Sequence, residues 1–496
     1  MRMFMVICRW LDGLRQEMRG WTRGSRMWLA IPLLLAMAAP GMAAEGGHAE
    51  AAVPFWTVLP FAVYLLAIAV LPLFAAHFWE HNRNKFILAV VISLPILGFL
   101  FTGHPEGPHW LIHSLKEYAA FIALLASLYI ITGGVYIRGS FAGTPLVNTV
   151  FLAIGALVAS FVGTTGASML LIRPILRANA KRTRVAHIVI FFIFIVSNGA
   201  GMLTPLGDPP LFLGFLRGVP FLWTFKLWMP WALVNGLLLV IFNLYDQAVL
   251  NREEKERPGS QLEEVQQVKE PLHFEGALNF LFLAGVIAVI YVMGAYGSAI
   301  HPNADVQLLC QVGGMLAMAG LSLKLTGKET RTANKFSWGP IIEVAVIFIG
   351  IFVTMVPALK YLEMKAASGD IQVTQPWQFF WMSGALSSFL DNAPTYLTFA
   401  SLATGVVNQA HPAAGLTADA LGGMLAYPDG ILFLTAISCG SVFMGANTYI
   451  GNGPNFMVKA IAEESGVKMP SFFGYMAYSG AILIPLFVIV TLVFFR

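Results

Sequence analysis

The 496-residue sequence has little charge. Only 11% of its residues are Asp, Glu, Lys or Arg, whereas 57% are apolar. A soluble globular protein carries about 25% charged residues, so this shortage excludes a soluble enzyme, a disordered tail and a nucleic-acid-binding protein. We therefore expect an all-α polytopic membrane protein whose first partner is the lipid bilayer.

Cysteine and charge of one sign are also scarce. The three cysteines, Cys8, Cys310 and Cys439, lie far apart and outside any zinc-type spacing, so neither a disulfide framework nor a zinc site is expected. The net charge of +4 is too small to indicate an anionic partner. The sequence has no phosphate-binding loop, nucleophile elbow or metal-binding histidine cluster, so we expect no ATP-driven pump, no enzyme activity and no cofactor.

The N-terminal residues 1–44 have the composition of a cleavable signal peptide. Six arginines within residues 1–26 precede a short apolar run at 28–37 and small residues that end at Ala44. A first membrane-spanning helix is the alternative, but the run is short for a hydrocarbon core about 30 Å thick. The signal peptide predicts a bacterial inner-membrane protein with its mature N-terminus in the periplasm.

Ten apolar runs further along the chain are long enough to span a membrane. They lie at residues 57–78, 86–103, 115–135, 185–203, 227–247, 276–295, 306–323, 339–358, 430–446 and 472–495. Two longer apolar stretches, about 144–177 and 377–404, are interrupted midway by the polar runs Gly163–Gly166 and Asp391–Thr395. Non-helical backbone at membrane depth is tolerated only where protein or a wet cavity satisfies it, so we expect two re-entrant helical hairpins.

The distribution of Lys and Arg predicts the orientation. With the mature N-terminus in the periplasm, eighteen of these residues fall in cytoplasmic segments and six in periplasmic segments. This excess agrees with the positive-inside rule. The charged stretch 251–271 then becomes a cytoplasmic linker between two transporter repeats, residues 55–250 and 272–496.

The two halves resemble each other in sequence. An offset of 226 residues superposes Glu117 on Glu343 and Thr165, in the first hairpin tip, on Asp391 in the second. An offset of 244 superposes the run 206–212 on 450–456, and Thr204 on Thr448. Because one hairpin enters from the cytoplasm and the other from the periplasm, the repeats are inverted. Inverted repeats are typical of secondary transporters, which bind their substrates near the membrane midplane.

Two segments, 197–210 and 440–454, are too rich in Gly, Pro and polar residues to be continuous helices, so we expect them to unwind within the membrane. Freed carbonyls and side-chain oxygens are the ligands that a hard cation prefers, which predicts Na⁺ at the two hairpin tips. The candidate ligands are Thr164, Thr165, Ser168, Ser197, Asn198, Thr204, Asp208, Asp391, Asn392, Thr395, Asn447, Thr448 and Asn452.

Four acids, Glu117, Asp208, Glu343 and Asp391, fall at membrane depth. A charge at a helix centre there costs ~2.5–3.5 kcal/mol, so each acid needs a partner, a cavity or a proton. A carboxylate that either H⁺ or Na⁺ must neutralise is the simplest antiporter site, and Asp208 and Asp391 are the leading candidates. Glu117 and Glu343 either take part in proton coupling or only favour the dipole of their helices.

The run Leu203–Pro210, with its Gly-Asp-Pro, and the run Phe389–Thr395, with its Asp-Asn, resemble the ion transporter superfamily over residues 55–496. That superfamily contains NhaD-type sodium/proton antiporters, citrate/metal and divalent-anion/sodium symporters, and arsenite permeases. The two motifs are most similar to the NhaD-type antiporters, which implies exchange of Na⁺ or Li⁺ for H⁺ by a homodimer. The first tip departs from the antiporters by reading Thr165-Gly166 where they tend to carry Asp-Asn, so the citrate-transporter branch stays open.

The first hypothesis is therefore a Na⁺(Li⁺)/H⁺ antiporter that works by alternating access, with Na⁺ and H⁺ as coupling ions. The second is a cation-coupled citrate or dicarboxylate transporter, in which the N-termini of half-helices hold the anion. A channel, or a membrane subunit that does not transport, is the third.

Overall fold

The computed structural model describes residues 53–139, 141–259 and 273–496. The predicted signal peptide and most of the predicted linker lie outside these residues. Residues 251–256 of that linker are helical, because they continue the last helix of the first half.

The first half is almost entirely helical. Its elements are η1 (Phe55–Thr57), α3 (Val58–Phe74), α4 (Ala76–Trp79), α5 (Asn82–Gly98), η2 (Phe99–Gly103), α6 (Gly107–Thr132), β1 (Tyr136–Arg138), α7 (Pro145–Val162), α8 (Thr164–Ala178), α9 (Ala186–Ile195), η3 (Gly199–Met202), α10 (Pro209–Leu216), η4 (Phe221–Leu227) and α11 (Trp228–Glu256). Apolar runs form helices here because a helix satisfies its own backbone groups in lipid.

The second half repeats the order of hairpin, broken helix and final long helix, although its strand comes before its first helix. Its elements are β2 (His273–Glu275), α13 (Leu278–Ile300), α14 (Ala304–Leu325), α15 (Lys328–Ala333), α16 (Gly339–Ala367), α17 (Pro376–Ser387), α18 (Asn392–Ala410), η5 (Leu421–Ala426), α19 (Pro428–Met444), η6 (Gly445–Asn447), α20 (Gly453–Glu464) and α21 (Phe472–Phe494). The short strands β1 and β2 pair antiparallel, with Arg138 opposite His273, and are the strands of the described residues.

The all-α polytopic class is confirmed. Within the described residues, 10 helices are long and apolar enough to cross a membrane, the number that the sequence predicts. The two sets differ at one place. The hairpin arm Pro145–Val162 is long enough to count, whereas Ala186–Met202 is shorter than a full span, because α9 ends at Ile195 and only a 3-10 turn follows it.

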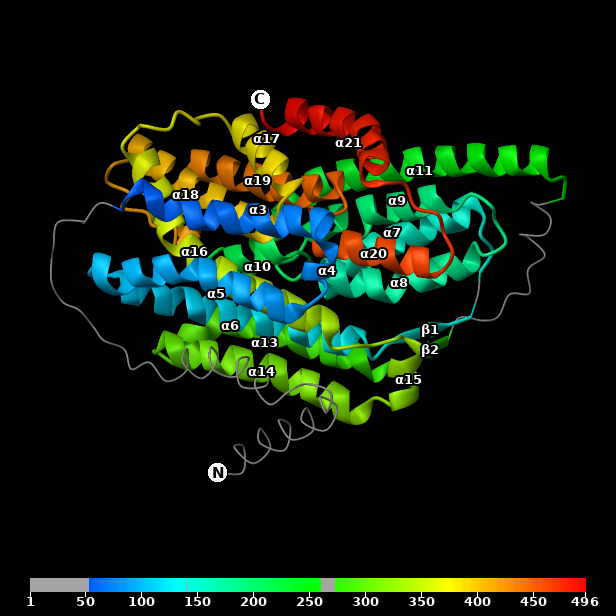
Figure 1. Cartoon of the computed structure of the whole chain (residues 1–496), viewed down its shortest axis with the longest axis horizontal. Helices are drawn as coiled ribbons and strands as arrows, with labels where there is room; N and C mark the ends of the chain where they lie inside the picture. Colours follow the sequence, from blue (N-terminus) through cyan, green and yellow to red (C-terminus); the bar gives the residue numbers. More distant parts are fainter. Residues whose placement is uncertain (1–52, 140, 260–272) are drawn as a thin grey trace.

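The two hairpins enter from opposite ends of the molecule. Figure 1 shows α7 and α8 toward the right and α17 and α18 toward the left. Gly163 joins the first pair with a φ of +82°, a left-handed conformation that glycine adopts without strain. Residues 388–391 join the second pair, and the Asp391 side chain accepts a hydrogen bond from the Ala393 N–H at the start of α18.

The broken helices keep the predicted offset of 244 residues. Asp208 precedes α10 with φ −143° and ψ 145°, and Asn452 precedes α20 with φ −149° and ψ 141°. The offset of 226 at the hairpin tips is wrong by two residues. Because α8 begins at Thr164 and α18 at Asn392, Asp391 is the equivalent of Gly163 and not of Thr165.

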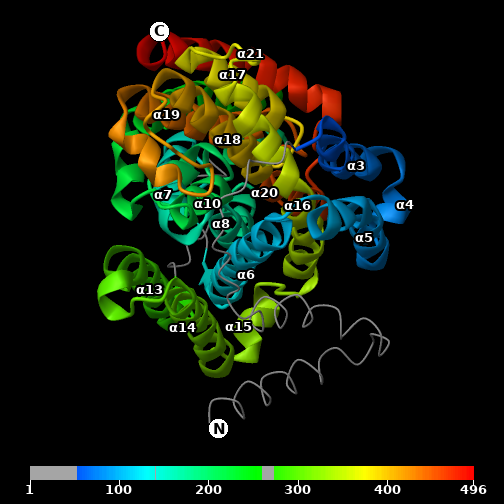
Figure 2. The same ribbon diagram turned by 90° about the vertical axis from the view of Figure 1, so that its left-hand side faces the viewer.

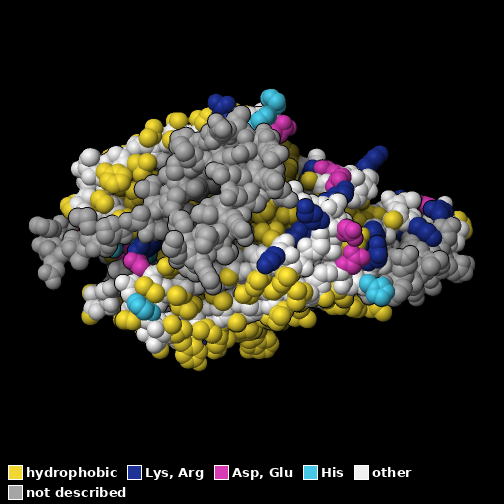
Figure 3. All heavy atoms as spheres, turned by 90° about the horizontal axis from the view of Figure 1, so that it is seen from below, with side chains coloured by type: hydrophobic (Ala, Val, Ile, Leu, Met, Phe, Trp, Pro, Cys, Tyr) yellow, Lys and Arg dark blue, Asp and Glu magenta, His cyan; other side chains and the backbone are white. Residues whose placement is uncertain are grey.

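The remaining helices form an apolar surround. Helices α13 and α14 pack on each other and on α6, and α16 packs against α3, α5, α6 and α18. Figure 2 shows α13 and α14 on the far side of the molecule from α17, α19 and α21. Large apolar side chains are exposed on α3, α5, α13, α14 and α21. Figure 3 shows apolar side chains gathered along the lower edge of the face that it draws. Such a surface suits a lipid environment.

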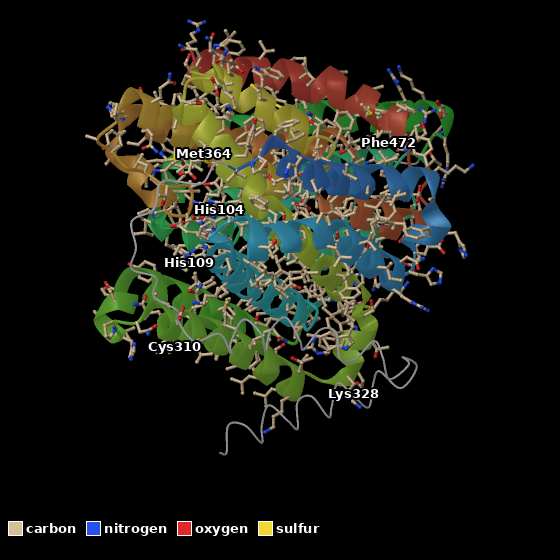
Figure 4. All side chains as sticks on the ribbon, turned by 60° about the vertical axis from the view of Figure 1, so that its left-hand side comes forward. His104, His109, Cys310, Lys328, Met364 and Phe472 are labelled. Atoms are coloured by element: carbon tan, nitrogen blue, oxygen red, sulfur yellow. The ribbon has the colours of Figure 1, made fainter. Side chains whose placement is uncertain are left out.

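The predicted periplasmic and cytoplasmic residues lie at opposite ends. In Figure 4, His104, His109 and Met364 lie toward one end of the helices and Lys328 and Phe472 toward the other. The sequence-based orientation assigns the first set to the periplasm and the second to the cytoplasm.

This orientation can be tested with two matched alanine-to-cysteine variants at exposed positions, Ala413→Cys between α18 and α19 and Ala180→Cys after α8. In a background without native cysteines, we expect a membrane-impermeant maleimide to label Ala413→Cys in right-side-out vesicles and Ala180→Cys only in inside-out vesicles. Labelling of both from the same side would contradict the inverted topology.

Candidate functional site

Both predicted breaks are present. Helix α9 ends at Ile195 and α10 begins only at Pro209, while α19 ends at Met444 and α20 begins at Gly453. Short 3-10 turns and irregular backbone fill the two intervals. The four interrupted elements, two hairpins and two broken helices, meet in the middle of the molecule.

Asp208 lies where these elements meet and is 1% exposed. Its Oδ1 accepts a hydrogen bond from Thr164 Oγ1 at 2.8 Å, and its Oδ2 accepts one from Asn392 Nδ2 at 2.7 Å. Asn452 Nδ2 donates to Oδ1 over 3.4 Å. The donors come from the first hairpin tip, the second hairpin tip and the second broken helix, so one carboxylate connects both repeats.

An amide network joins the two broken helices behind Asp208. Asn198 Nδ2 donates to Asn455 Oδ1 at 2.7 Å, and Asn198 Oδ1 accepts from Asn452 Nδ2 at 3.1 Å. Asn455 Nδ2 in turn donates to the carbonyls of Gly445 and Thr448. Asn455 is not among the sequence-predicted residues. The signal was its place three residues after Asn452 in a Gly-Asn-Gly-Pro-Asn run.

Hydroxyl groups position the other members of the site. The Ser168 and Ser197 hydroxyls lie 2.8 Å apart, which links α8 to the first break. Ser387 Oγ donates to Asn392 Oδ1 at 2.7 Å and thereby leaves the Asn392 amide N–H free to donate to Asp208. Sequence reasoning missed Ser387, because it lies before the polar tip motif.

Asp391 is the second acid of the site. It is half-buried, and its carboxylate accepts a hydrogen bond from Ala393 N. It directly precedes Asn392, whose side-chain amide donates to Asp208 at 2.7 Å. Within the described residues, neither acid forms an ion pair with Lys, Arg or His, and their partners are hydroxyl, amide and backbone groups. Two carboxylates without a cationic partner favour a small cation or a proton.

The remaining predicted ligands surround this centre. Thr204 Oγ1 donates to the Ser160 carbonyl, and its equivalent Thr448 donates to the Ser388 carbonyl. Thr395 donates to the Asp391 carbonyl within its own helix, and the half-buried Thr165 follows Thr164 at the first tip.

Asn447 Nδ2 donates to Ser388 Oγ at 2.8 Å, while its buried Oδ1 has no hydrogen-bond donor. An oxygen without a donor suits a hard cation. In the described residues, no cluster of His, Cys, Asp and Glu could hold a metal ion through three or more such side chains.

Glu117 and Glu343 do not join the site. Glu117 accepts two hydrogen bonds from Arg217, Nε to Oε1 at 2.8 Å and Nη2 to Oε2 at 2.9 Å. Glu343 is 40% exposed and pairs with Lys85 Nζ at 2.6 Å. Each of these acids has a cation as its partner, unlike Asp208 and Asp391, and their part in proton coupling stays a prediction.

One comparison with known proteins gives a match. A family model described as "Putative citrate transport" matches residues 50–495. No curated protein matches the chain.

The close approach within the first break generates a test. A Cβ on Gly207 would lie 2.4 Å from the Gly201 carbonyl oxygen, whereas a Cβ on Gly453 would meet nothing within 4 Å. The Gly207 carbonyl also accepts a hydrogen bond from Thr164 N at 2.8 Å. We expect Gly207→Ala to lower the free energy of unfolding by about 1–3 kcal/mol, as a disturbed buried hydrogen bond does. We expect Gly453→Ala to change it little.

Thermal unfolding of the two purified variants in detergent measures the difference. Equal melting temperatures for Gly207→Ala and the unsubstituted protein would contradict the described packing of the first break.

Proposed function

The chain belongs to the citrate-transport family whose model spans almost all of it and is a membrane transporter, and we propose that it exchanges Na⁺ or Li⁺ for H⁺ at Asp208 and Asp391. In this proposal it is a secondary active transporter of a bacterial inner membrane, with its mature N-terminus in the periplasm.

The observation that carries the proposal is the pair of carboxylates whose partners are all neutral. A charge in a buried site within a membrane is costly unless a counter-charge or a proton neutralises it. Because Lys and Arg do not neutralise Asp208, a mobile cation has to. Na⁺ suits the site, because hydroxyl, amide and unwound carbonyl oxygens surround the acids.

Exchange follows if Na⁺ and H⁺ neutralise the same carboxylates. A protonated Asp208 is a poor ligand for Na⁺, and a Na⁺-bound carboxylate does not need the proton, so occupancy by one ion excludes the other. In this proposal, each hairpin lies between the site and the solution on one side of the membrane. Each also donates one hydrogen bond to Asp208, the first from Thr164 and the second from Asn392. Alternating access then requires that the hairpins leave Asp208 exposed to one side at a time.

A second candidate is cation-coupled transport of citrate or a dicarboxylate. The family description favours it. So does the start of α8, where Gly163 provides no side-chain cap and Thr164 donates its backbone N–H to the Gly207 carbonyl, because the N–H groups that follow in the first turn of a helix attract a carboxylate. The acids would then hold the coupling cation beside the anion.

Proteoliposomes that contain a lumenal pH dye separate the two candidates. For Na⁺/H⁺ exchange, we expect a Na⁺ pulse to change the lumenal pH in the absence of any organic acid. A pH change that requires citrate would contradict exchange and support the second candidate.

The site itself can be tested by removing its charges. We expect Asp208→Asn and Asp391→Asn each to reduce transport more than tenfold. An amide carries no negative charge, so it cannot exchange a bound proton for Na⁺. Asp429→Asn, an exposed acid in the first turn of α19, is the matched control and should transport normally. Full transport by both site variants would contradict the proposed site.

A further inference from the structure

A group of five charged residues lies at the end of α10 away from Asp208. We name it the Arg217 cluster, and its members are Glu117, Arg217, Lys360, Glu363 and Asp419. Arg217 directly follows α10, and Asp419 lies in the connection between α18 and α19. The predicted orientation places the cluster on the periplasmic side of the site.

The Arg217 cluster joins four segments. Arg217 is 4% exposed and Glu117 is 6% exposed, and besides Glu117 the guanidinium donates from Nη1 to the Ala418 carbonyl at 3.0 Å. Asp419 Oδ2 accepts from Lys360 Nζ at 2.7 Å. Glu363 Oε1 accepts from Ala418 N at 3.2 Å. Helices α6 and α16 thus hold the end of α10 and the connection that follows α18.

Asp419 is charged within this cluster. Burial by itself would raise its pKa, but the charges of Lys360 and Arg217 outweigh burial and keep the pKa of Asp419 below its usual range. A buried ion pair adds little net stability, whereas the loss of one partner is costly. Of the pairs in the cluster, Glu117–Arg217 is the buried one, so it gains little stability when made but is costly to leave with one partner missing.

Helix α10 connects the Arg217 cluster to the proposed ion site. It has 8 residues, with Asp208 at its N-cap and Arg217 at its C-cap. A helix rises 1.5 Å per residue, so the two positions are about 13 Å apart. The backbone of Arg217 is also fixed, because its carbonyl accepts a hydrogen bond from Gly422 N at 3.1 Å. Because α10 is short and its C-terminal end is hydrogen-bonded to the connection that follows α18, a shift of Asp208 along the α10 axis would pull on the contacts of Arg217.

The contact at the corresponding end of α20 is more exposed than the Arg217 cluster. Helix α20, the counterpart of α10, ends at Glu464, which pairs with Lys335 just before α16. These two side chains are 54% and 58% exposed, respectively. Exposed ion pairs contribute little and break readily. The end of α10 is therefore held by more buried ion pairs than the end of α20.

We propose that the Arg217 cluster is a latch that closes the periplasmic side of the site, and that α10 releases it when a cation occupies Asp208. This inference rests on the proposed function, which identifies the cation as Na⁺ or Li⁺. Beyond the proposed function, the latch identifies α10 as the helix that transmits the occupancy of Asp208 to the interface that α6 and α16 form with the interrupted helices.

A disulfide across the latch tests closure. In a background with the native cysteines replaced, Lys360→Cys with Asp419→Cys replaces a 2.7 Å ion pair that crosses the interface. The matched control, Lys365→Cys with Asp370→Cys, replaces a 2.8 Å ion pair between α16 and the loop that follows it. We expect oxidation to reduce transport more than tenfold in the first pair, reversibly on reduction, and less than twofold in the control. Unchanged transport by the fully oxidised 360/419 protein would overturn the latch.

The rate of disulfide formation tests coupling without a transport assay. We expect saturating Na⁺ to slow formation of the 360/419 disulfide at least threefold, and we expect no Na⁺ effect when Asp208→Asn is added. The same rate with and without Na⁺ in the parent protein would overturn the coupling through α10. A failure of the proposed function is recognised separately, because the reduced and unsubstituted proteins would then show no Na⁺/H⁺ exchange.

A charge-swapped variant distinguishes loss of the ion pair from misfolding caused by a single substitution. Glu117→Arg alone places two cations together and should lower both the folded yield and transport. Glu117→Arg combined with Arg217→Glu restores the pair, and we expect it to recover at least one third of the transport. A folded double variant without recovery would contradict a latch made by this pair.

Discussion

The structure depends on one buried carboxylate. Asp208 is almost fully removed from solvent, and each of its hydrogen-bond donors is a neutral hydroxyl or amide. In a membrane protein this arrangement is stable only with a proton or a cation in place. The need to stabilise this carboxylate explains why both hairpin tips and both broken helices converge on it. Together they supply neutral polar groups, and these leave room for a cation or a proton to bind and leave.

The two halves use one architecture for unequal tasks. Equivalent positions hold Asp208 and Asn452, and Gly163 and Asp391, so each pair supplies one carboxylate. The acids therefore lie on different halves, one in a broken helix and one at a hairpin tip. At the ends of α10 and α20 the difference is again one of burial, a buried cluster at Arg217 and an exposed pair at Glu464.

The sequence predicts features that are local. Gly, Pro and polar residues inside apolar runs locate the hairpin tips and the breaks, because those residues disfavour helix wherever the chain folds. The register between the tips was missed by two residues, since a single residue, Gly163, joins the first pair of helices whereas four residues, 388–391, join the second. The partners of Glu117, Asn198 and Asn392 were also beyond the sequence, because Arg217, Asn455 and Asp208 reach them only through tertiary packing.

The central claim is that Na⁺ and H⁺ exclude each other at Asp208. Proton release on addition of Na⁺ to the purified protein in a weakly buffered solution measures this most directly. The account predicts that Na⁺ binding releases protons from the unsubstituted protein and none from Asp208→Asn. Na⁺ binding to the unsubstituted protein without proton release, over a pH range from about 5 to 9 in which carboxylates in buried sites titrate, would contradict it.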